Sequence, residues 1–256
     1  MKLTNRNYFS KKANREYMSV SQFKSFETCP ECAMAEINGK WERPKTAALL
    51  VGSYVDAYFE GRLDIFVKKH PECFKRDGSL KNEYVQANAI IARIESDKLM
   101  TEYLTGRKQV IMEGVIEGVK VKIKVDVLGD GRICDLKIMR DFNSVYVEEH
   151  GRLPWYEAWR YDLQGAVYQE IVRQNTGEKL PFYLVAATKE PVTDIGIWHI
   201  SQNLMDFELE KFREKLPVYD AMKKKIVDTY RCERCDYCRS TKVLTEPNEC
   251  EGEFEI

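Results

Sequence analysis

Few histidines, no long apolar run and almost no net charge mark this 256-residue sequence. With only His70, His150 and His199 available, a catalytic scheme built on histidine is not expected. No run approaches the ~18 apolar residues of a spanning helix, so no membrane segment is predicted. The opening MKLTNRNYFSKK has no apolar core of signal-peptide length, which favours a cytoplasmic protein. A net charge of −1 gives no global basic field, so any site for a polyanion must be local.

Composition and periodicity predict one globular domain. Hydrophobic content of 44% and charged content of 32% are typical of a chain that buries a core. The predicted helices cover 19–40, 46–60, 82–105, 157–174 and 204–225, and the strands lie within 109–139, 181–188 and 194–200. This order favours a single α/β (α+β) domain over residues 1–256, with a central mixed sheet flanked by helices. Its N-terminal part is expected to be helical, and its tail, from about 228 to 256, is cysteine-rich.

The stretch VDVLGDGRICDLK, residues 125–137, has the pattern of a hairpin with charged residues inside apolar strands. Asp130-Gly131 suits a two-residue type I′ turn, because both central residues need positive φ. That turn sets Asp126 opposite Asp135, and opposed residues point to the same face. Lys137, two residues beyond Asp135, shares that face. The other face is expected to be core and carries Val121, Ile123, Val125, Val127, Cys134, Leu136 and Ile138.

Two opposed carboxylates repel each other unless a cation lies between them. Mg²⁺ takes one or two carboxylates and completes its shell with water and phosphate oxygens, and Mn²⁺ has similar preferences. A turn at Glu117-Gly118 pairs Glu113 with Lys122, which places Glu113 on the same side of the sheet as Asp126. A metal site with Asp126, Asp135 and Glu113 is therefore indicated, with a lysine beside the metal-bound water. The alternative is a solvated face on which Asp and Lys form weak surface pairs.

The residues of this site carry a resemblance to a known family. Asp126 followed by Asp135-Leu136-Lys137 resembles the core of the PD-(D/E)xK nuclease superfamily. Gln164 and Tyr168, which share a helix face, resemble the Gln-x-x-x-Tyr motif of the RecB-like branch, and residues 19–30 resemble its opening. The nearest likeness is to phage RecE-like (exonuclease VIII-like) exodeoxyribonucleases, over about 18 to 240. It implies a restriction-endonuclease-like core.

The resemblance also implies a function. The catalytic set that it implies is Asp126, Asp135, Lys137, Gln164 and Tyr168. The expected activity is Mg²⁺-dependent (or Mn²⁺-dependent) exonucleolytic hydrolysis of DNA in phage-type recombination, by a bacterial or phage-encoded protein. A single-strand annealing recombination protein and further copies of the chain are the expected partners beside DNA.

One position departs from the family pattern. Asp56, within the first motif, stands where relatives usually carry a metal-binding histidine. Aspartate can also ligate a hard cation, so Asp56 joins the expected metal ligands. The alternative that this change suggests is a nuclease fold that has lost turnover and serves as a DNA-binding or recombination accessory protein. The third interpretation is a zinc-stapled structural module whose carboxylates are surface groups.

Eight cysteines in a chain expected to be intracellular indicate reduced thiols or metal ligands rather than disulfides. Cys232, Cys235 and Cys238 stand at x₂ spacing, which resembles the wrapping of an iron–sulfur cluster with a fourth ligand from elsewhere. Several RecB-like nucleases hold such a cluster with one cysteine before the first motif, where Cys29 stands. A [4Fe–4S] cluster on these four residues is therefore expected. Zinc stays open, since Cys29 and Cys32 with Cys232 and Cys235 would make a closed site.

Overall fold

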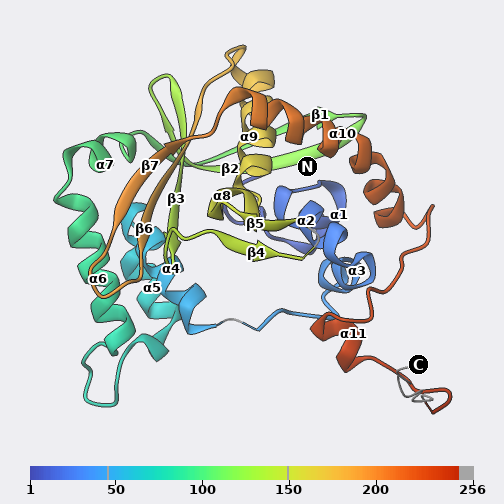
Figure 1. The fold of residues 1–256 in the computed structure, drawn as a ribbon, viewed down its shortest axis with the longest axis horizontal. Helices are drawn as coiled ribbons and strands as arrows, with labels where there is room; N and C mark the ends of the chain where they lie inside the picture. Colours follow the sequence, from blue (N-terminus) through green and yellow to red (C-terminus); the bar gives the residue numbers. More distant parts are fainter. Residues whose placement is uncertain (45, 149, 248–256) are drawn as a thin grey trace, which may run out of the picture.

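A computed structural model describes residues 1–44, 46–148 and 150–247 of the chain. The end of the expected tail, residues 248–256 with Cys250, lies outside the described residues. A five-stranded mixed sheet of order β1-β2-β3-β6-β7 forms the centre (Figure 1). Its strands are β1 (Arg107–Ile116), β2 (Val119–Gly129), β3 (Arg132–Met139), β6 (Phe182–Thr188) and β7 (Ile195–His199). Only the β3–β6 pair among them is parallel, so the expected mixed sheet is confirmed.

Helices cover both faces of this sheet (Figure 1). One layer contains α2 (Val20–Thr28), α3 (Pro30–Asn38), α9 (Tyr161–Thr176) and α10 (Gln202–Lys223), and the other contains α4 (Ala47–Phe59), α5 (Leu63–Lys69), α6 (Asn82–Glu95) and α7 (Lys98–Tyr103). Each layer packs its own apolar core against the sheet. None of the helices in the described ranges combines the length and apolarity needed to cross a membrane.

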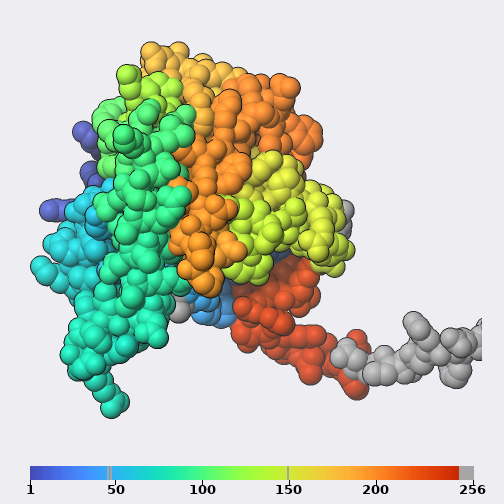
Figure 2. All heavy atoms as spheres, turned by 60° about the vertical axis from the view of Figure 1, so that its left-hand side comes forward, coloured from blue at the N-terminus to red at the C-terminus, as the bar shows by residue number. Residues whose placement is uncertain are grey.

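Short elements complete the fold. They are α1 (Lys11–Glu16), η1 (Pro71–Cys73), the hairpin of β4 (Val145–Val147) and β5 (Gly151–Leu153), α8 (Trp155–Ala158) and α11 (Asp236–Ser240). Figure 2 shows the β7 edge of the sheet at the surface, with α6 on one side and the segment of the β4–β5 hairpin on the other. The sequence analysis predicted none of these as a separate element, because each is too short to show a period. Only the end of α8 falls inside a predicted helix, the one over 157–174.

Two predicted helices are each divided in the structure. The predicted helix over 19–40 breaks at Cys29, whose backbone is extended (φ −165°, ψ 102°) because Pro30 disfavours helical backbone in the residue before it. The predicted helix over 82–105 breaks at Asp97, whose side chain accepts hydrogen bonds from the N–H groups of Leu99 and Met100 at 3.0 Å. A new N-cap therefore starts α7.

The predicted turns give the predicted register near them. Glu113 pairs with Lys122 across β1 and β2, and Gly129 pairs with Arg132 across β2 and β3. The predicted pairing of Asp126 with Asp135 is wrong, however, because the β2–β3 ladder ends at Val127 and Cys134. Beyond it the strands part, and Asp126 Oδ2 instead accepts the Leu136 N–H over 3.2 Å.

The prediction of a single apolar core face is also wrong. Val121, Ile123 and Val125 pack in the α9–α10 core, whereas Val127, Cys134 and Leu136 pack in the α4–α6 core. The apolar side chains of β2 therefore pack in one core before Asp126 and in the other core after it. On the edge that β3 leaves, Met18 pairs with Val121, so the N-terminal segment replaces β3 there. The opening between the Met18–Val121 pair and the end of the β2–β3 ladder lies at residues 123–126.

Candidate active site

Four charged side chains meet where β2 and β3 part. Asp126 comes from β2, Asp135 and Lys137 come from β3, and Asp56 comes from α4. Lys137 Nζ forms an ion pair with Asp135 Oδ2. The carboxyl group of Asp56 interacts with Lys137 and Asp135, so it faces this group and not the far side of its helix. The structure thus brings together three expected metal ligands and the expected catalytic lysine.

Two glutamine side chains fix the orientation of the carboxylates. Gln164, on α9, donates from Nε2 to Asp135 Oδ1 over 2.7 Å. Gln109, on β1, donates from Nε2 to Asp126 Oδ1 over 3.0 Å. The backbone of Gln109 is left-handed (φ 53°), a strained conformation for a residue other than glycine. The sequence analysis missed Gln109, although the β1–β2 register that it predicted already places this residue opposite Asp126.

Burial and mutual repulsion shift the pKa values of the site. Burial raises the pKa of Asp126 well above its usual range, and the charge of Asp135 adds to this effect. Burial also raises the pKa of Asp56 to about 7, against the attraction of Lys137. Burial alone would lower the pKa of Lys137, but Asp135 and Asp126 outweigh it and raise that pKa. The site holds more acidic groups than one lysine can neutralise.

These residues fit a hard divalent cation. Asp135 Oδ2 is buried, touches Lys137 without hydrogen-bond geometry, and accepts no hydrogen bond from the described residues. Asp56 and Asp126 line a cavity of about 10 Å³, roughly the space of one water molecule. Carboxylate oxygens are the ligands that Mg²⁺ and Mn²⁺ prefer, and a cation here would remove the repulsion. Among the described residues, the carboxylate oxygens of Asp56, Asp126 and Asp135 do not form a group within 4.8 Å of one another. Asp126 and Asp135 are therefore the residues that would hold the cation, with Asp56 facing them.

A cleft of about 400 Å³ borders the carboxylates. Asp126, Gln164 and Tyr168 line it, and the Tyr168 hydroxyl donates to the Lys124 carbonyl over 3.2 Å. The same cleft is lined by basic and aromatic side chains, namely Lys24, Lys122, Lys124, Tyr8 and Phe9. A local basic wall of this kind suits a phosphate backbone, even in a chain whose net charge is −1.

Glu113 is the expected ligand that the structure does not bring to this group. It lies opposite Lys122, four residues along β2 from Asp126, which corresponds to about 13 Å of strand. The Glu113 carboxylate interacts with the Tyr17 hydroxyl instead. The sequence analysis missed Glu60, which lines the cleft one helical turn after Asp56. The spacing of four residues between Asp56 and Glu60, which places both on one helix face, was the signal in the sequence.

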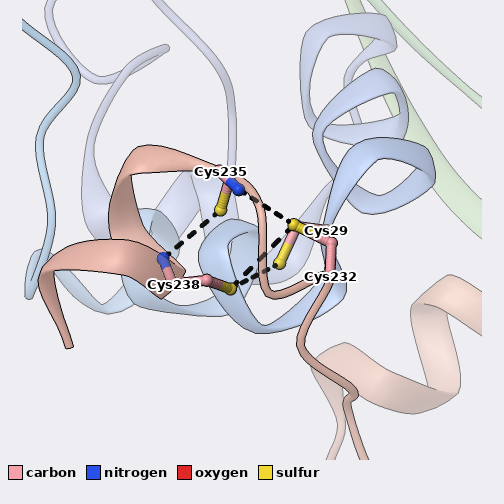
Figure 3. Close-up of side chains that lie close together, drawn as sticks. All are labelled: Cys29, Cys232, Cys235 and Cys238. Carbon is pink, nitrogen blue, oxygen red and sulfur yellow. Dashed lines mark hydrogen bonds between the residues drawn. The ribbon is translucent and has the colours of Figure 1, made fainter. Parts of the chain in front are cut away.

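A second cluster joins the tail to the N-terminal helices (Figure 3). The Sγ atoms of Cys29, Cys232, Cys235 and Cys238 all lie within 4.8 Å of one another. Cys29 reaches the cluster because it stands at the break between α2 and α3. Burial would raise the pKa of the Cys232 thiol, but backbone N–H groups of Arg234 and Cys235 lower it to about 6. Burial raises the pKa of Cys29 to about 12 and also raises the pKa of Cys235. The shift toward a thiolate, the form that binds metals, is therefore at Cys232.

The spacing of the sulfur atoms fits a single zinc ion. Four thiolates at 2.3 Å from one zinc ion are about 3.8 Å apart. Cys238 Sγ lies 3.6 Å from Cys29 Sγ and 4.0 Å from Cys232 Sγ. The alternative set with Cys32 in place of Cys238 is wrong for the described residues, since Cys238 completes the group. Cys32 lies beside it and donates its backbone N–H to Cys29 Sγ over 3.5 Å.

Comparison with known proteins supports the resemblance. The family described as "PDDEXK-like domain of unknown function (DUF3799)" matches residues 19–241. The crystal structure of a "Putative exonuclease" from Eubacterium rectale is 47% identical, covers 97% of this chain and 97% of its own, and has a TM-score of 0.94. The structure named SSO0001 is 13% identical over 74% of this chain and 85% of its own, and its TM-score of 0.29 supports no argument. No curated protein matches. The chain belongs to the PDDEXK-like domain family, and the restriction-endonuclease-like α/β fold expected from its PD-(D/E)xK resemblance is confirmed.

Proposed function

We propose that this chain hydrolyses DNA phosphodiester bonds from an end, in a reaction that depends on Mg²⁺ or Mn²⁺. The observation that carries the proposal is the meeting of Asp126, Asp135 and Lys137 beside a basic cleft. The 47% identity to a protein named "Putative exonuclease" supports attack from an end. The likeness to RecE-like nucleases supports a role in phage-type recombination, with a single-strand annealing protein as partner and with several copies of the chain in one assembly.

The site residues have separate tasks in this reaction. Asp126 and Asp135 would hold the cation, and the bound cation would supply polarisation of the phosphate and a lowered pKa of a water molecule. Lys137 Nζ, beside Asp135, orients the attacking water and stabilises charge that develops on the phosphate. Gln164 and Gln109 keep the two aspartates aimed through their hydrogen bonds.

Tyr168 supports the cleft beside the aspartates. Its hydroxyl binds the Lys124 carbonyl at the point where β2 has lost β3 as a neighbour. The ring also lines the cleft, so it lies where the DNA backbone would pass. Gln164 and Tyr168, one helical turn apart on α9, therefore act on different parts of the site.

The test is cleavage of linear and closed circular duplex DNA by the full chain, with Mg²⁺, with Mn²⁺ and without added metal. We expect either metal to support degradation of linear DNA only. Lys137→Ala should abolish it, whereas Lys211→Ala should not, because Lys211 on α10 lies over Phe207 outside the cleft lining. Cleavage of the closed circle would contradict the requirement for an end.

Asp56 favours a second candidate function, because it stands where relatives usually carry a metal-binding histidine. In that case the chain is an accessory protein that binds DNA without turnover. Retention of linear DNA in a binding assay, with no degradation under either metal, would select this candidate over the nuclease.

We further propose that Cys29, Cys232, Cys235 and Cys238 hold one structural zinc ion. A [4Fe–4S] cluster places irons and sulfides between its thiolates and so needs them farther apart than this group has them. The metal would connect residues that are 209 positions apart in the chain. Its task would be to fix the tail to the junction of α2 and α3.

A further inference from the structure

The N-terminal segment forms one wall of the cleft, although the family match begins only at residue 19. Leu3, Tyr8 and Tyr17 pack together in a small core of their own. Phe9 differs from them, because it is 72% exposed. Its ring stands edge-on to that of Tyr8, with centroids 4.9 Å apart and an interplanar angle of 83°. The buried Tyr8 ring thus holds the exposed Phe9 ring at the cleft.

A buried ammonium group fixes this wall to β2. Lys122 is 1% exposed, and its Nζ donates to the Tyr8 carbonyl and, over 2.7 Å, to Asn14 Oδ1. The same Nζ lies 4.5 Å from the centroid of the Tyr8 ring. These partners within the described residues are all neutral, whereas a buried charge is ordinarily paired. Lys122 therefore leaves positive charge at the cleft for an anion to balance.

A second lysine stands beside the exposed ring. Lys124 Nζ lies 5.7 Å from the centroid of the Phe9 ring. Lys122, Lys124 and Asp126 alternate along β2, and all three line the same cleft as Phe9. The cleft therefore joins an exposed aromatic face, two cationic groups and the proposed catalytic carboxylate. These are the groups that would meet the base, the phosphates and the scissile bond of a DNA strand.

We propose that Phe9 stacks on an unpaired base of a single-stranded DNA end, while Lys124 and Lys122 face its phosphates; this rests on the proposed hydrolysis of DNA. Aromatic platforms combined with a basic groove bind single strands without sequence preference. Bases inside a duplex are already stacked on both faces, so only a single-stranded or frayed end offers a free face. A volume of about 400 Å³ is in the range of sites for one small molecule and suits one nucleotide, not a duplex.

Binding without added Mg²⁺ or Mn²⁺ tests the role of Phe9. The probe is a fluorescein-labelled dodecathymidine, compared with the same strand carrying abasic residues at both ends. We expect the full chain to bind the thymine strand about tenfold more tightly than the abasic strand. Phe9→Ala should remove that difference, Phe9→Tyr should keep it, and Phe207→Ala should keep it as well. Phe207 is the matched control, because it is 59% exposed and has Lys211 Nζ 4.1 Å from its ring centroid.

Two results would overturn the assignment of Phe9. One is equal binding of both strands by the wild type. The other is a Phe9→Ala protein that still prefers the thymine strand. If that protein differs from the wild type only in its oligomeric state, measured by size-exclusion chromatography, Phe9 belongs to a contact between copies of the chain.

The salt dependence of binding tests Lys124. The slope of log K against log salt for single strands changes by about 0.7 for each phosphate contact. Lys124→Gln should reduce the slope by about that amount, and Lys211→Gln should leave it unchanged. An unchanged slope for Lys124→Gln would remove this lysine from the proposal.

The binding result and the cleavage result separate the two proposals. If the wild type cleaves no DNA under either metal but Phe9→Ala loses the preference for bases, the hydrolysis proposal fails and the stacking assignment stands. If the wild type cleaves linear DNA and Phe9→Ala binds like the wild type, only the stacking assignment fails.

Discussion

Gln109 and Asp126 face each other across β1 and β2, and the Gln109 amide donates to Asp126 Oδ1 over 3.0 Å. The left-handed backbone of Gln109 (φ 53°) lies opposite the point where β2 changes core sides. Backbone strain of this kind costs about 1–3 kcal/mol and persists where the surrounding structure imposes it. The strained residue here is the one that aims a proposed metal ligand.

Gln109→Gly should therefore separate activity from stability. Glycine adopts positive φ readily, so the melting temperature should stay the same or rise. Loss of the amide should weaken metal activation or cleavage by about 10–100-fold, which a Mg²⁺ titration of DNA degradation measures. The matched control is Glu117→Gly, since Glu117 also has positive φ (47°) but lies in the β1–β2 turn. If Gln109→Gly cleaves DNA at the wild-type rate at limiting Mg²⁺, the Gln109 amide does not position Asp126.

Changing either proposed metal ligand should stop cleavage but affect stability differently. Asp126→Asn replaces a carboxyl group whose ionised form is disfavoured by burial and by the charge of Asp135, so the melting temperature without added Mg²⁺ should be unchanged or higher. Asp135→Asn leaves Lys137 without its ion-pair partner and should lower the free energy of unfolding by roughly 2–4 kcal/mol. Denaturant unfolding of both variants measures the difference. Equal stability of the two would contradict the ion pair, and retained cleavage by either would remove that residue from the site.

The sequence predicted the register of the hairpins but not the place where they part. Asp130-Gly131 and Glu117-Gly118 specify their pairings locally, because a two-residue turn fixes the residues next to it. The end of the β2–β3 ladder depends on Met18 and α9, which approach from distant parts of the chain. The sequence therefore placed Asp126 on the right strand and near Asp135, but it gave Asp126 the wrong backbone pairing.

For the cysteines, too, the sequence indicated one part of the site and the fold decided the rest. Spacing alone indicated that Cys232, Cys235 and Cys238 act together, and the family resemblance indicated Cys29. Cys29 reaches the cluster at the helix break that Pro30 signals and that the helix prediction did not include. The choice between Cys238 and Cys32 depended on how the tail folds against the junction of α2 and α3. The cleft wall at Phe9 had no periodic pattern that could reveal it.

Asp56→His should keep the activity of the proposed nuclease. The carboxyl group of Asp56 faces Lys137 and Asp135, so an imidazole at this position could ligate the same cation. Imidazole suits Mn²⁺ better than Mg²⁺, and the ratio of activities with the two metals should shift toward Mn²⁺. Asp56→Asn, which cannot donate an imidazole nitrogen, is the control. An unchanged metal ratio in Asp56→His would exclude Asp56 from the metal shell.

Lys122 should make stability rise in alkaline solution. Burial lowers the pKa of Lys122 to about 8, from its usual 10.5. Between these two pH values the unfolded chain holds a proton that the folded chain has lost, so the free energy of unfolding rises with pH. The groups that face this ammonium are Tyr8, Asn14 and Lys223, and burial lowers the pKa of Lys223 to about 8 as well.

The measurement is denaturant unfolding of wild type and Lys122→Met from pH 7 to 10.5. The stability of the wild type relative to the variant should increase by roughly 2–3 kcal/mol over this range. Lys120→Met is the control, because Lys120, two residues away on β2, is exposed and pairs with Glu16 of α1. A difference between wild type and Lys122→Met that does not depend on pH would contradict the lowered pKa.

The cysteine cluster should contain one zinc ion per chain and contribute to stability. A cross-link between Cys29 and Cys238, 209 positions apart, removes loop-closure entropy worth up to about 5 kcal/mol in the unfolded chain. Cys238→Ser should therefore lose the zinc and lower the melting temperature, whereas Cys32→Ser should keep the zinc, because Cys32 is outside the group of four. Elemental analysis after anaerobic purification measures the metal. Brown protein with absorbance near ~400 nm would instead identify the [4Fe–4S] cluster, and metal-free protein with unchanged stability in Cys238→Ser would exclude both.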